Sequence, residues 1–208
     1  MRVRRTGSNT LGAVAAVAAL ATMAAAPFHA TTPPAAMTGG FGEQSCAFCH
    51  IGNDVNASGG SVRLEGVPSV WEPGREYVIT VDLRADETAI AGFQVAARYL
   101  EGAARGRPAG FLEPVDGRTA VSDSLGIAYL HQSEAGSATH DPSGARWSFG
   151  WRAPAANAIG SDATVVFHVA ANSGNGDNSP LGDLVYTAEH TLPRASPTPT
   201  HDPRRPPS

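Results

Sequence analysis

The sequence predicts an all-β protein built as a β-sandwich, and three observations support this. Residues 61–192 consist of short segments in which apolar and polar residues alternate, as in strands with one buried face. Gly, Pro, Asn or Asp residues separate these segments, which is typical of turns between antiparallel strands. After residue 30, no run has the three- and four-residue apolar spacing of an amphipathic helix. About seven or eight strands are expected.

The clearest strand is expected over residues 76–84. Its two sides are formed by Tyr77, Ile79, Val81 and Leu83 and by Thr80, Asp82 and Arg84. Later segments repeat this alternation through Ala91, Phe93, Val95, Ala97 and Tyr99, then Trp147, Phe149 and Trp151, then Val165, Phe167, Val169 and Ala171, and finally Leu184, Tyr186 and Ala188. Burying one large apolar side chain stabilises a fold by roughly 1.5–3 kcal/mol. We therefore expect a single core that needs no disulfide.

Residues 1–30 have the layout of a secretory signal peptide. Three arginines precede an apolar run over residues 11–26, and small residues follow. Cleavage is expected between residues 26 and 30. A retained membrane anchor is the alternative, but the Ala-rich run falls short of the roughly 20 residues needed to cross a bilayer. The polar residues after Arg4 and Arg5 do not suit a twin-arginine signal. We expect general secretion, to the periplasm or the cell exterior.

Two further segments lie outside the predicted sandwich. Residues 31–60 are rich in Thr, Pro, Gly, Ser and Asn without periodicity, and they should be irregular. Residues 193–208 are rich in Pro and polar groups, which predicts a disordered tail. The mature chain is therefore expected to have no integral membrane span. Its oligomeric state is open.

The charged residues argue against a nucleic-acid-binding surface. The chain has 15 positive residues, all of them Arg, and 19 acidic residues. Removing residues 1–30 takes away three Arg and no acidic residue, which leaves a formal charge of −7. The remaining arginines are scattered, so neither nucleic acid nor an anionic lipid surface is an expected partner.

The strongest chemical signal is the pentapeptide Cys46-Ala47-Phe48-Cys49-His50. Two thiols at this spacing, followed by His, are typical of covalent haem c attachment. The thiols can reach the two vinyl groups on one edge of the porphyrin, and the imidazole then falls under the iron. We therefore expect one haem c, bonded to Cys46 and Cys49, with His50 as the proximal iron ligand. Export agrees with this, because haem attachment in bacteria takes place beyond the cytoplasmic membrane.

Two other interpretations of the cysteine pair stay open. A redox dithiol or a disulfide explains the two cysteines, but it requires no His and usually opens a helix of a βαβ fold. A structural zinc site needs a fourth ligand and usually a second paired motif, which the sequence lacks.

The distal iron ligand is less constrained. His131 ends a short predicted strand before a loop and is our first candidate. The other candidates are His140, His168, His190, His201 and Met37. His168 also suits an ordinary strand position and His140 an ordinary turn. An iron with no distal protein ligand is a further possibility, and it would suit ligand binding or peroxide chemistry.

Outside this motif, no residue pattern indicates catalysis. There is no nucleophile elbow, zinc-protease motif, phosphate loop or second haem motif. The loop from Asn172 to Asp183 carries side-chain oxygens that could bind Ca²⁺, but a Gly- and Asn-rich turn explains it as well. Whether the protein is an enzyme is therefore uncertain, and an electron carrier is favoured over a substrate-converting enzyme. A peroxidase would need an open iron site with a distal acid–base group.

Residues 40–192 resemble the bacterial reeler-like proteins described as choice-of-anchor V domains. The matching features, in order, are Gly42-Glu43 through Cys46, Cys49 and His50, Pro73-Gly74 before Tyr77, Gly92-Phe93-Gln94, Ala97-Arg98, the series Trp147, Phe149, Trp151, Ala153 and Pro154, and Gly182-Asp183 with Tyr186. Where relatives often have a His-Thr pair after an aromatic strand residue, His131 stands one place early. The cysteines of animal reelin domains are absent. The resemblance implies an immunoglobulin-like, reelin-type sandwich and an extracytoplasmic location.

Two functional hypotheses follow from the sequence. The first is a monohaem c-type protein that transfers electrons or binds haem, with an unidentified redox protein as its partner. The second is a non-catalytic surface interaction or adhesion module in which the cysteine pair is structural. Visible absorption distinguishes the two.

Overall fold

The alternating segments form nine β-strands in the computed structural model, which describes residues 32–196. The strands are β1 (Gly60–Glu65), β2 (Glu76–Ala85), β3 (Ile90–Tyr99), β4 (Phe111–Pro114), β5 (Thr119–Ser124), β6 (Ile127–Gln132), β7 (Gly144–Arg152), β8 (Val165–Gly174) and β9 (Leu184–Leu192). The described helices are all short: α1 (Glu134–Ser137) and the 3₁₀ helices η1 (Gly40–Gly42), η2 (Cys46–Phe48) and η3 (Gly102–Ala104).

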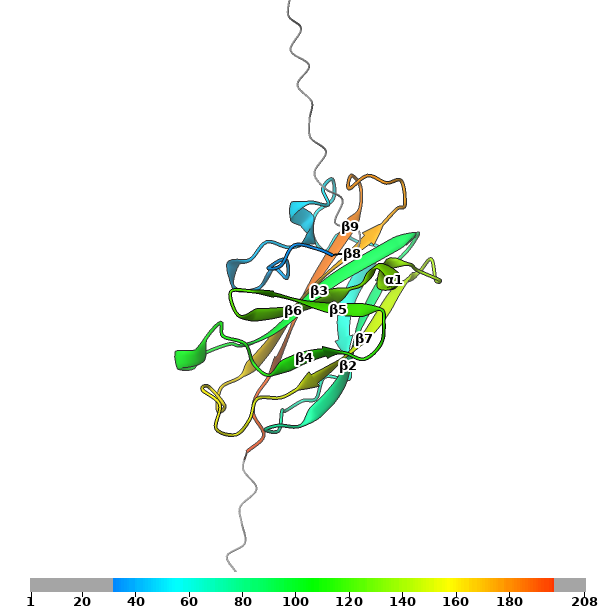
Figure 1. The fold of residues 1–208 in the computed structure, drawn as a ribbon. Coiled ribbons are helices and arrows are strands. Elements are labelled where there is room, and N and C mark those ends of the chain that lie inside the picture. Colours follow the sequence, from blue (N-terminus) through cyan, green and yellow to red (C-terminus); the bar gives the residue numbers. More distant parts are fainter. Residues whose placement is uncertain (1–31, 197–208) are drawn as a thin grey trace, which may run out of the picture.

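The strands form two antiparallel sheets that pack face to face (Figure 1). One sheet has the order β1-β2-β7-β4 and the other the order β5-β6-β3-β8-β9. Strands that are neighbours in the sheet are often distant in sequence, as are β3 and β8. The predicted all-β sandwich is thus confirmed.

The core lies between the two sheets and contains the apolar faces expected from the sequence. Phe93 of β3 packs on Trp147 of β7, with ring centroids 4.6 Å apart. Trp151 of β7 meets Phe167 of β8 edge to face at 5.0 Å. The largest fully buried side chains of this core are Trp71, Trp147, Trp151, Tyr186, Phe93, Phe149 and Phe167. Aromatic pairs across the interface therefore join the sheets.

The N-terminal part of the described chain covers β3 and β8 on the outer face of the five-stranded sheet. Residues 32–59, here called the N-terminal segment, pack against it and bury Gln94 and Arg98 of β3. The Met37 backbone N–H donates to the Gln94 side-chain oxygen at 2.7 Å, and the Gln94 amide donates to the Pro34 carbonyl at 2.9 Å. The segment is irregular, as expected, but it has a fixed position on the sheet.

Both boundaries of the predicted sandwich differ slightly in the structure. Strand β1 begins at Gly60. At the other end, the Trp71 N–H donates to the Pro193 carbonyl at 3.0 Å, and the Ala195 N–H donates to the Trp71 carbonyl at 2.8 Å. The start of the predicted tail is therefore paired, because the backbone of Trp71 supplies hydrogen-bond partners for it. The signal peptide and residues 197–208 lie outside the described residues. Within residues 32–196, no helix is long and apolar enough to span a bilayer.

Candidate functional site

The CAFCH motif forms a single tight turn at the surface of the N-terminal segment. Ser45 caps η2 by accepting a hydrogen bond from the Ala47 N–H at 3.3 Å. The N–H groups of Cys49 and His50 both donate to the Cys46 carbonyl, at 3.1 and 3.0 Å. The turn thus gathers both cysteines and the histidine within one loop of backbone.

The two thiols are not joined, and they have different surroundings. Cys46 is half-buried and Cys49 is exposed. Burial raises the pKa of the Cys46 thiol to about 12, so that this thiol stays protonated at neutral pH. Reactive cysteines of dithiol oxidoreductases depend instead on a lowered pKa. The environment of Cys46 therefore disfavours the redox-dithiol interpretation.

The His50 imidazole is oriented by a carboxylate far away in sequence. Its Nδ1 lies 2.6 Å from Oδ2 of Asp183, which immediately precedes β9. About a third of the His50 side chain is exposed (34%), whereas Asp183 is buried (4%). Because the carboxylate engages Nδ1, Nε2 is the nitrogen left to bind a metal. Metal-binding histidines usually have this arrangement.

Asp183 is itself held in place by three asparagines. The Asn175 N–H donates to Asp183 Oδ1 at 3.2 Å, and the Asn172 amide lies 3.5 Å from Oδ2. From the N-terminal segment, the Asn53 amide donates to the carbonyls of Gly182 and Asp183 at 2.8 and 3.1 Å. The orienting carboxylate therefore has little freedom to move relative to His50.

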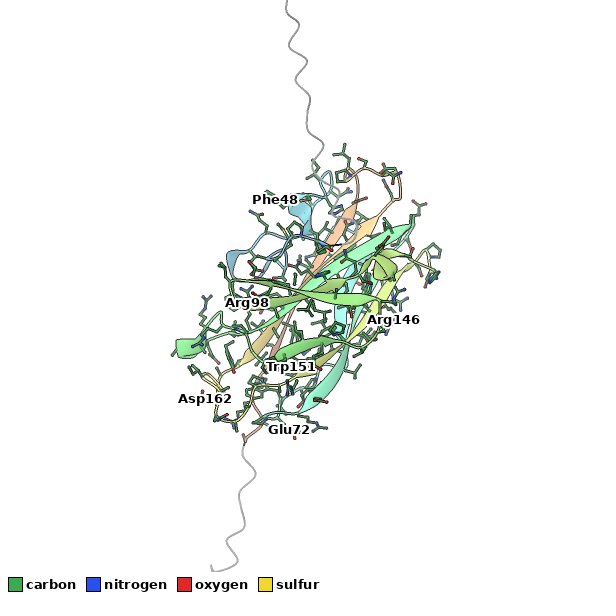
Figure 2. The ribbon with its side chains drawn as sticks, in the orientation of Figure 1. Phe48, Glu72, Arg98, Arg146, Trp151 and Asp162 are labelled. Carbon is green, nitrogen blue, oxygen red and sulfur yellow. The ribbon has the colours of Figure 1, made fainter. Side chains whose placement is uncertain are left out.

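The chain after His50 pairs with the loop between β8 and β9. The Ile51 N–H donates to the Pro180 carbonyl at 3.0 Å, and the Gly182 N–H donates to the Ile51 carbonyl at 2.8 Å. Three apolar side chains in and beside this pairing are exposed: Phe48 (62%), Ile51 (49%) and Leu181 (57%). Phe48 lies at the periphery of the molecule (Figure 2). The motif is thus bordered by apolar side chains that nothing in the described structure covers.

A shallow cavity of about 270 Å³ lies on β8 and β9, beside Thr38 and Gly39 of the N-terminal segment. His168 in its lining pairs with Glu189, with Nε2 and Oε2 3.0 Å apart. Burial lowers the pKa of His168, although Glu189 opposes this shift. Gly40 is required here, because a Cβ at this position would meet the His168 ring at 2.3 Å. The full lining is Thr38, Gly39, His168, Thr187, Ala188 and Glu189.

His131 lies three strands away from β9, the strand that follows Asp183. His131 lies in β6, opposite Gln94 of β3, and the same row continues through Ala170 of β8 to Thr187 of β9. Three strand spacings therefore separate it from β9, or about 14 Å. His131 is also buried, and its Nδ1 contacts the Gln132 carbonyl at 2.7 Å. The role of His131 as distal ligand stays a prediction, and the distance between β6 and β9 in the sheet disfavours it.

The other distal candidates are spread over the domain. His140 is exposed, in a loop whose Ala138 pairs with Ile90, the neighbour of Gly174 in β8. This places His140 at the same end of the sandwich as the loop before Asp183. His190 is half-buried in β9 and Met37 half-buried in the N-terminal segment, while His201 lies outside the described residues. Within residues 32–196, none of these candidates forms a hydrogen bond or an ion pair with His50.

The loop considered for Ca²⁺ is held together by its own hydrogen bonds. The Asp177 N–H donates to the Asn175 side-chain oxygen at 3.0 Å, and the Ser179 N–H donates to Asp177 Oδ1 at 2.8 Å. These are the turns that Asn and Asp commonly form. In the part of the chain that the structure describes, no three His, Cys, Asp or Glu residues are grouped as ligands for a metal ion.

Sequence reasoning found the three residues of the motif but not the partner of His50. Asp183 appeared only as a possible Ca²⁺ ligand and as a matching position of the resemblance. The two residues are 133 positions apart, and no local pattern relates them. The fold brings them together because the N-terminal segment runs along the β8–β9 loop.

The sequence matches no protein-family model and no curated protein. Among solved structures, the chain is similar to the human F-spondin reeler domain, with 20% identity and a TM-score of 0.46 over 69% of this chain and 95% of that one. It is also similar to the Reelin-N domain of F-spondin, with 18% identity and a TM-score of 0.46 over 73% and 96% of the two chains. A cohesin of Acetivibrio cellulolyticus scaffoldin B gives 18% identity and a TM-score of 0.35, over 62% and 98%.

Proposed function

We propose that this protein is an exported carrier of one covalent c-type haem and that it exchanges single electrons with another redox protein. The observation that carries the proposal is the orientation of His50. Asp183 engages its Nδ1 at 2.6 Å, so that Nε2 is available beside two cysteines at the haem c spacing. The haem, when bound, supplies a one-electron iron couple.

The residues around the motif fit such a group. Cys46 and Cys49 would hold it through thioether bonds, and His50 would ligate the iron. A porphyrin has large apolar faces, and the exposed side chains of Phe48, Ile51 and Leu181 are suited to pack against one. Covering them would remove apolar surface from water, which stabilises the complex by roughly 25 cal/mol per Å².

The chain itself would hold and tune the group. Asp183 orients the imidazole, Asn53 fixes the carboxylate-bearing loop, and the sandwich supplies a rigid base for both. Because the motif is exposed, a haem held there would be accessible to a partner protein. Such access suits electron transfer, in which no substrate needs to be enclosed.

The test is to produce the full chain together with a haem-attachment system and to examine the exported protein. We expect a haem stain after denaturing electrophoresis, a c-type reduced spectrum and a mass increase of one haem. The Cys46→Ala/Cys49→Ala double variant should be colourless after denaturation. Glu76→Gln, at an exposed position of β2 outside the motif, should match the wild type. Native material with both thiols free, or joined to each other, would contradict the proposal.

A second candidate function is a non-catalytic surface interaction module. The apolar side chains of Phe48, Ile51 and Leu181 favour it, because an exposed apolar cluster also suits contact with a protein. In this case the exported protein would be colourless, and substituting the two cysteines would not alter its absorption.

A further inference from the structure

We propose that Asp183 is a positioning residue that fixes His50 and lowers the reduction potential of the iron bound to it. The inference rests on the proposed function, and it assigns a role to a residue outside the CAFCH motif. The juxtaposition that carries it is a buried carboxylate 2.6 Å from Nδ1 of His50, which leaves Nε2 as the nitrogen that would bind the iron.

The contact has the geometry of a strong hydrogen bond. A separation of 2.6 Å is short for a nitrogen donor and a carboxylate, and charge-assisted bonds of this kind are about twice as strong as neutral ones. Oδ2 faces His50 and Oδ1 accepts from the Asn175 N–H at 3.2 Å. The Asn172 amide also lies 3.5 Å from Oδ2, so both carboxylate oxygens are held by neighbouring groups, and the contact with Oδ2 favours the Nδ1–H form of His50.

The charge of Asp183 is only weakly compensated. Within residues 32–196, His50 is the sole ion-pair partner of Asp183, and no Arg is paired with it. Only 4% of the Asp183 side chain is exposed, so water screens the carboxylate poorly. Coulomb interactions are several times stronger at such sites than in water. The negative charge therefore acts on the imidazole and, through it, on the iron.

The direction of the effect follows from the charges of the two iron states. Ferric iron carries one more positive charge than ferrous iron, and the transfer of one electron converts one state into the other. A carboxylate hydrogen-bonded to the ligand increases the donor strength of the imidazole. Both effects stabilise the ferric state more than the ferrous state. The potential is therefore lower than it would be without the carboxylate.

The ion pair between His168 and Glu189 differs from the His50–Asp183 pair in the burial of its carboxylate. Glu189, the partner of His168, has a side chain that is 54% exposed, against 4% for Asp183. Solvent screens an exposed carboxylate, and such pairs contribute little. The buried pair is the one at the haem-binding motif.

The experiment compares Asp183→Asn and Asp183→Ala with Asp54→Asn in the haem-loaded full chain. Asp54 is an exposed acid of the same segment, and its side chain forms no hydrogen bond or ion pair in the described structure. Its substitution removes the same charge without touching His50. The readout is the reduction potential, measured by spectroelectrochemical titration. We expect both Asp183 variants to shift to higher potential and Asp54→Asn to stay near the wild type.

A second readout uses the same variants without haem. Nitrogen-15 NMR of the imidazole at about pH 8.5 should show His50 in the Nδ1–H form in the wild type. In Asp183→Ala it should shift toward the Nε2–H form, while circular dichroism confirms that the sandwich is folded.

The outcomes separate this inference from the proposed function. Haem-loaded protein whose potential is unchanged by both Asp183 variants overturns the inference and leaves the function standing. A protein that never acquires haem overturns the function and, with it, the lowered potential. An unchanged His50 tautomer in folded Asp183→Ala overturns the positioning role whether or not haem is attached.

Discussion

Trp151 joins the two sheets through its ring and binds the segment before β4 through its indole N–H. The residue is fully buried, and its ring lies 5.4 Å from Tyr77 and 5.0 Å from Phe167 between centroids. Its Nε1 donates to the Ala109 carbonyl at 2.9 Å. Packing and hydrogen bonding therefore act at one position, and two substitutions can separate them.

We expect Trp151→Ala to lower the free energy of unfolding by about 3–5 kcal/mol, because the large cavity it leaves cannot fully collapse. Trp151→Phe keeps most of the ring but leaves the buried Ala109 carbonyl without its donor, which costs about 1–3 kcal/mol. Urea denaturation followed by circular dichroism measures both. Val78→Ala, on an exposed side chain of β2, is the control and should change stability by less than about 0.5 kcal/mol. Equal losses for both Trp151 variants would contradict this account.

At the level of single residues, the sequence predicted which side chains of the inward faces are buried, but not which side chains of the outward faces are buried. The alternation through Phe93 and Val95 placed both in the core, where they lie. The same pattern left Gln94 and Arg98 on a wet face, yet both are buried. Periodicity reports only which side a residue faces. It cannot tell whether another segment covers that side, since the covering segment here has no periodicity.

The N-terminal segment is held on β3 by a buried charged cluster. Arg98 pairs with Glu43, and the Tyr129 hydroxyl contacts both groups at 2.5 Å. The Arg98 side chain is 6% exposed and that of Glu43 is 11% exposed. Thr38 adds a hydrogen bond from its hydroxyl to Glu43 at 2.6 Å. The element that carries the CAFCH motif is thus attached to the sheet by a compact set of polar contacts.

Glu43→Gln should therefore destabilise the protein by about 3–5 kcal/mol, because the arginine stays buried without its counter-charge. Hydrogen exchange of residues 32–50 should increase more than exchange in β7. The double variant Glu43→Gln/Arg98→Met should recover part of the loss, since it also removes the unpaired charge. Glu76→Gln, at an exposed position of β2, is the matched control. An equal loss in the double variant and the single variant would show that the charge pair is not the cause.

At the level of elements, the sequence predicted the strands that line the core but not their neighbours. The short strands β4 and β5 carry few buried residues, so alternation is weak in them. The site depends on a pairing between the segment after His50 and the β8–β9 loop, and such long-range backbone pairing has no local signature. The spacing of the CAFCH motif therefore allows a prediction of its role, whereas no sequence pattern predicts the contact between His50 and Asp183.

At the level of the whole molecule, the packing of the segment links stability to pH through His168. Burial lowers the pKa of His168 from its ordinary value of 6.5, and the nearby charge of Arg98 adds to this effect. Glu189 opposes the shift from β9. The unfolded chain therefore binds a proton at a higher pH than the folded protein does. Stability contributed by neutral His168 is fully present above about pH 6.5 and is lost as the pH falls toward the folded pKa.

We expect the free energy of unfolding to fall between pH 7.5 and 5 in the wild type and to fall less in His168→Gln, which removes the titrating group. Glu189→Gln should steepen the fall, because it removes the contribution that raises the pKa of His168 and so widens the gap between the folded and unfolded values. Urea denaturation at intervals of half a pH unit measures these slopes. His140→Gln replaces an exposed histidine and should retain the wild-type slope. If His168→Gln also retained it, the burial of His168 under the N-terminal segment would not be the source of the pH dependence, and the segment would be less firmly packed in solution than its contacts indicate.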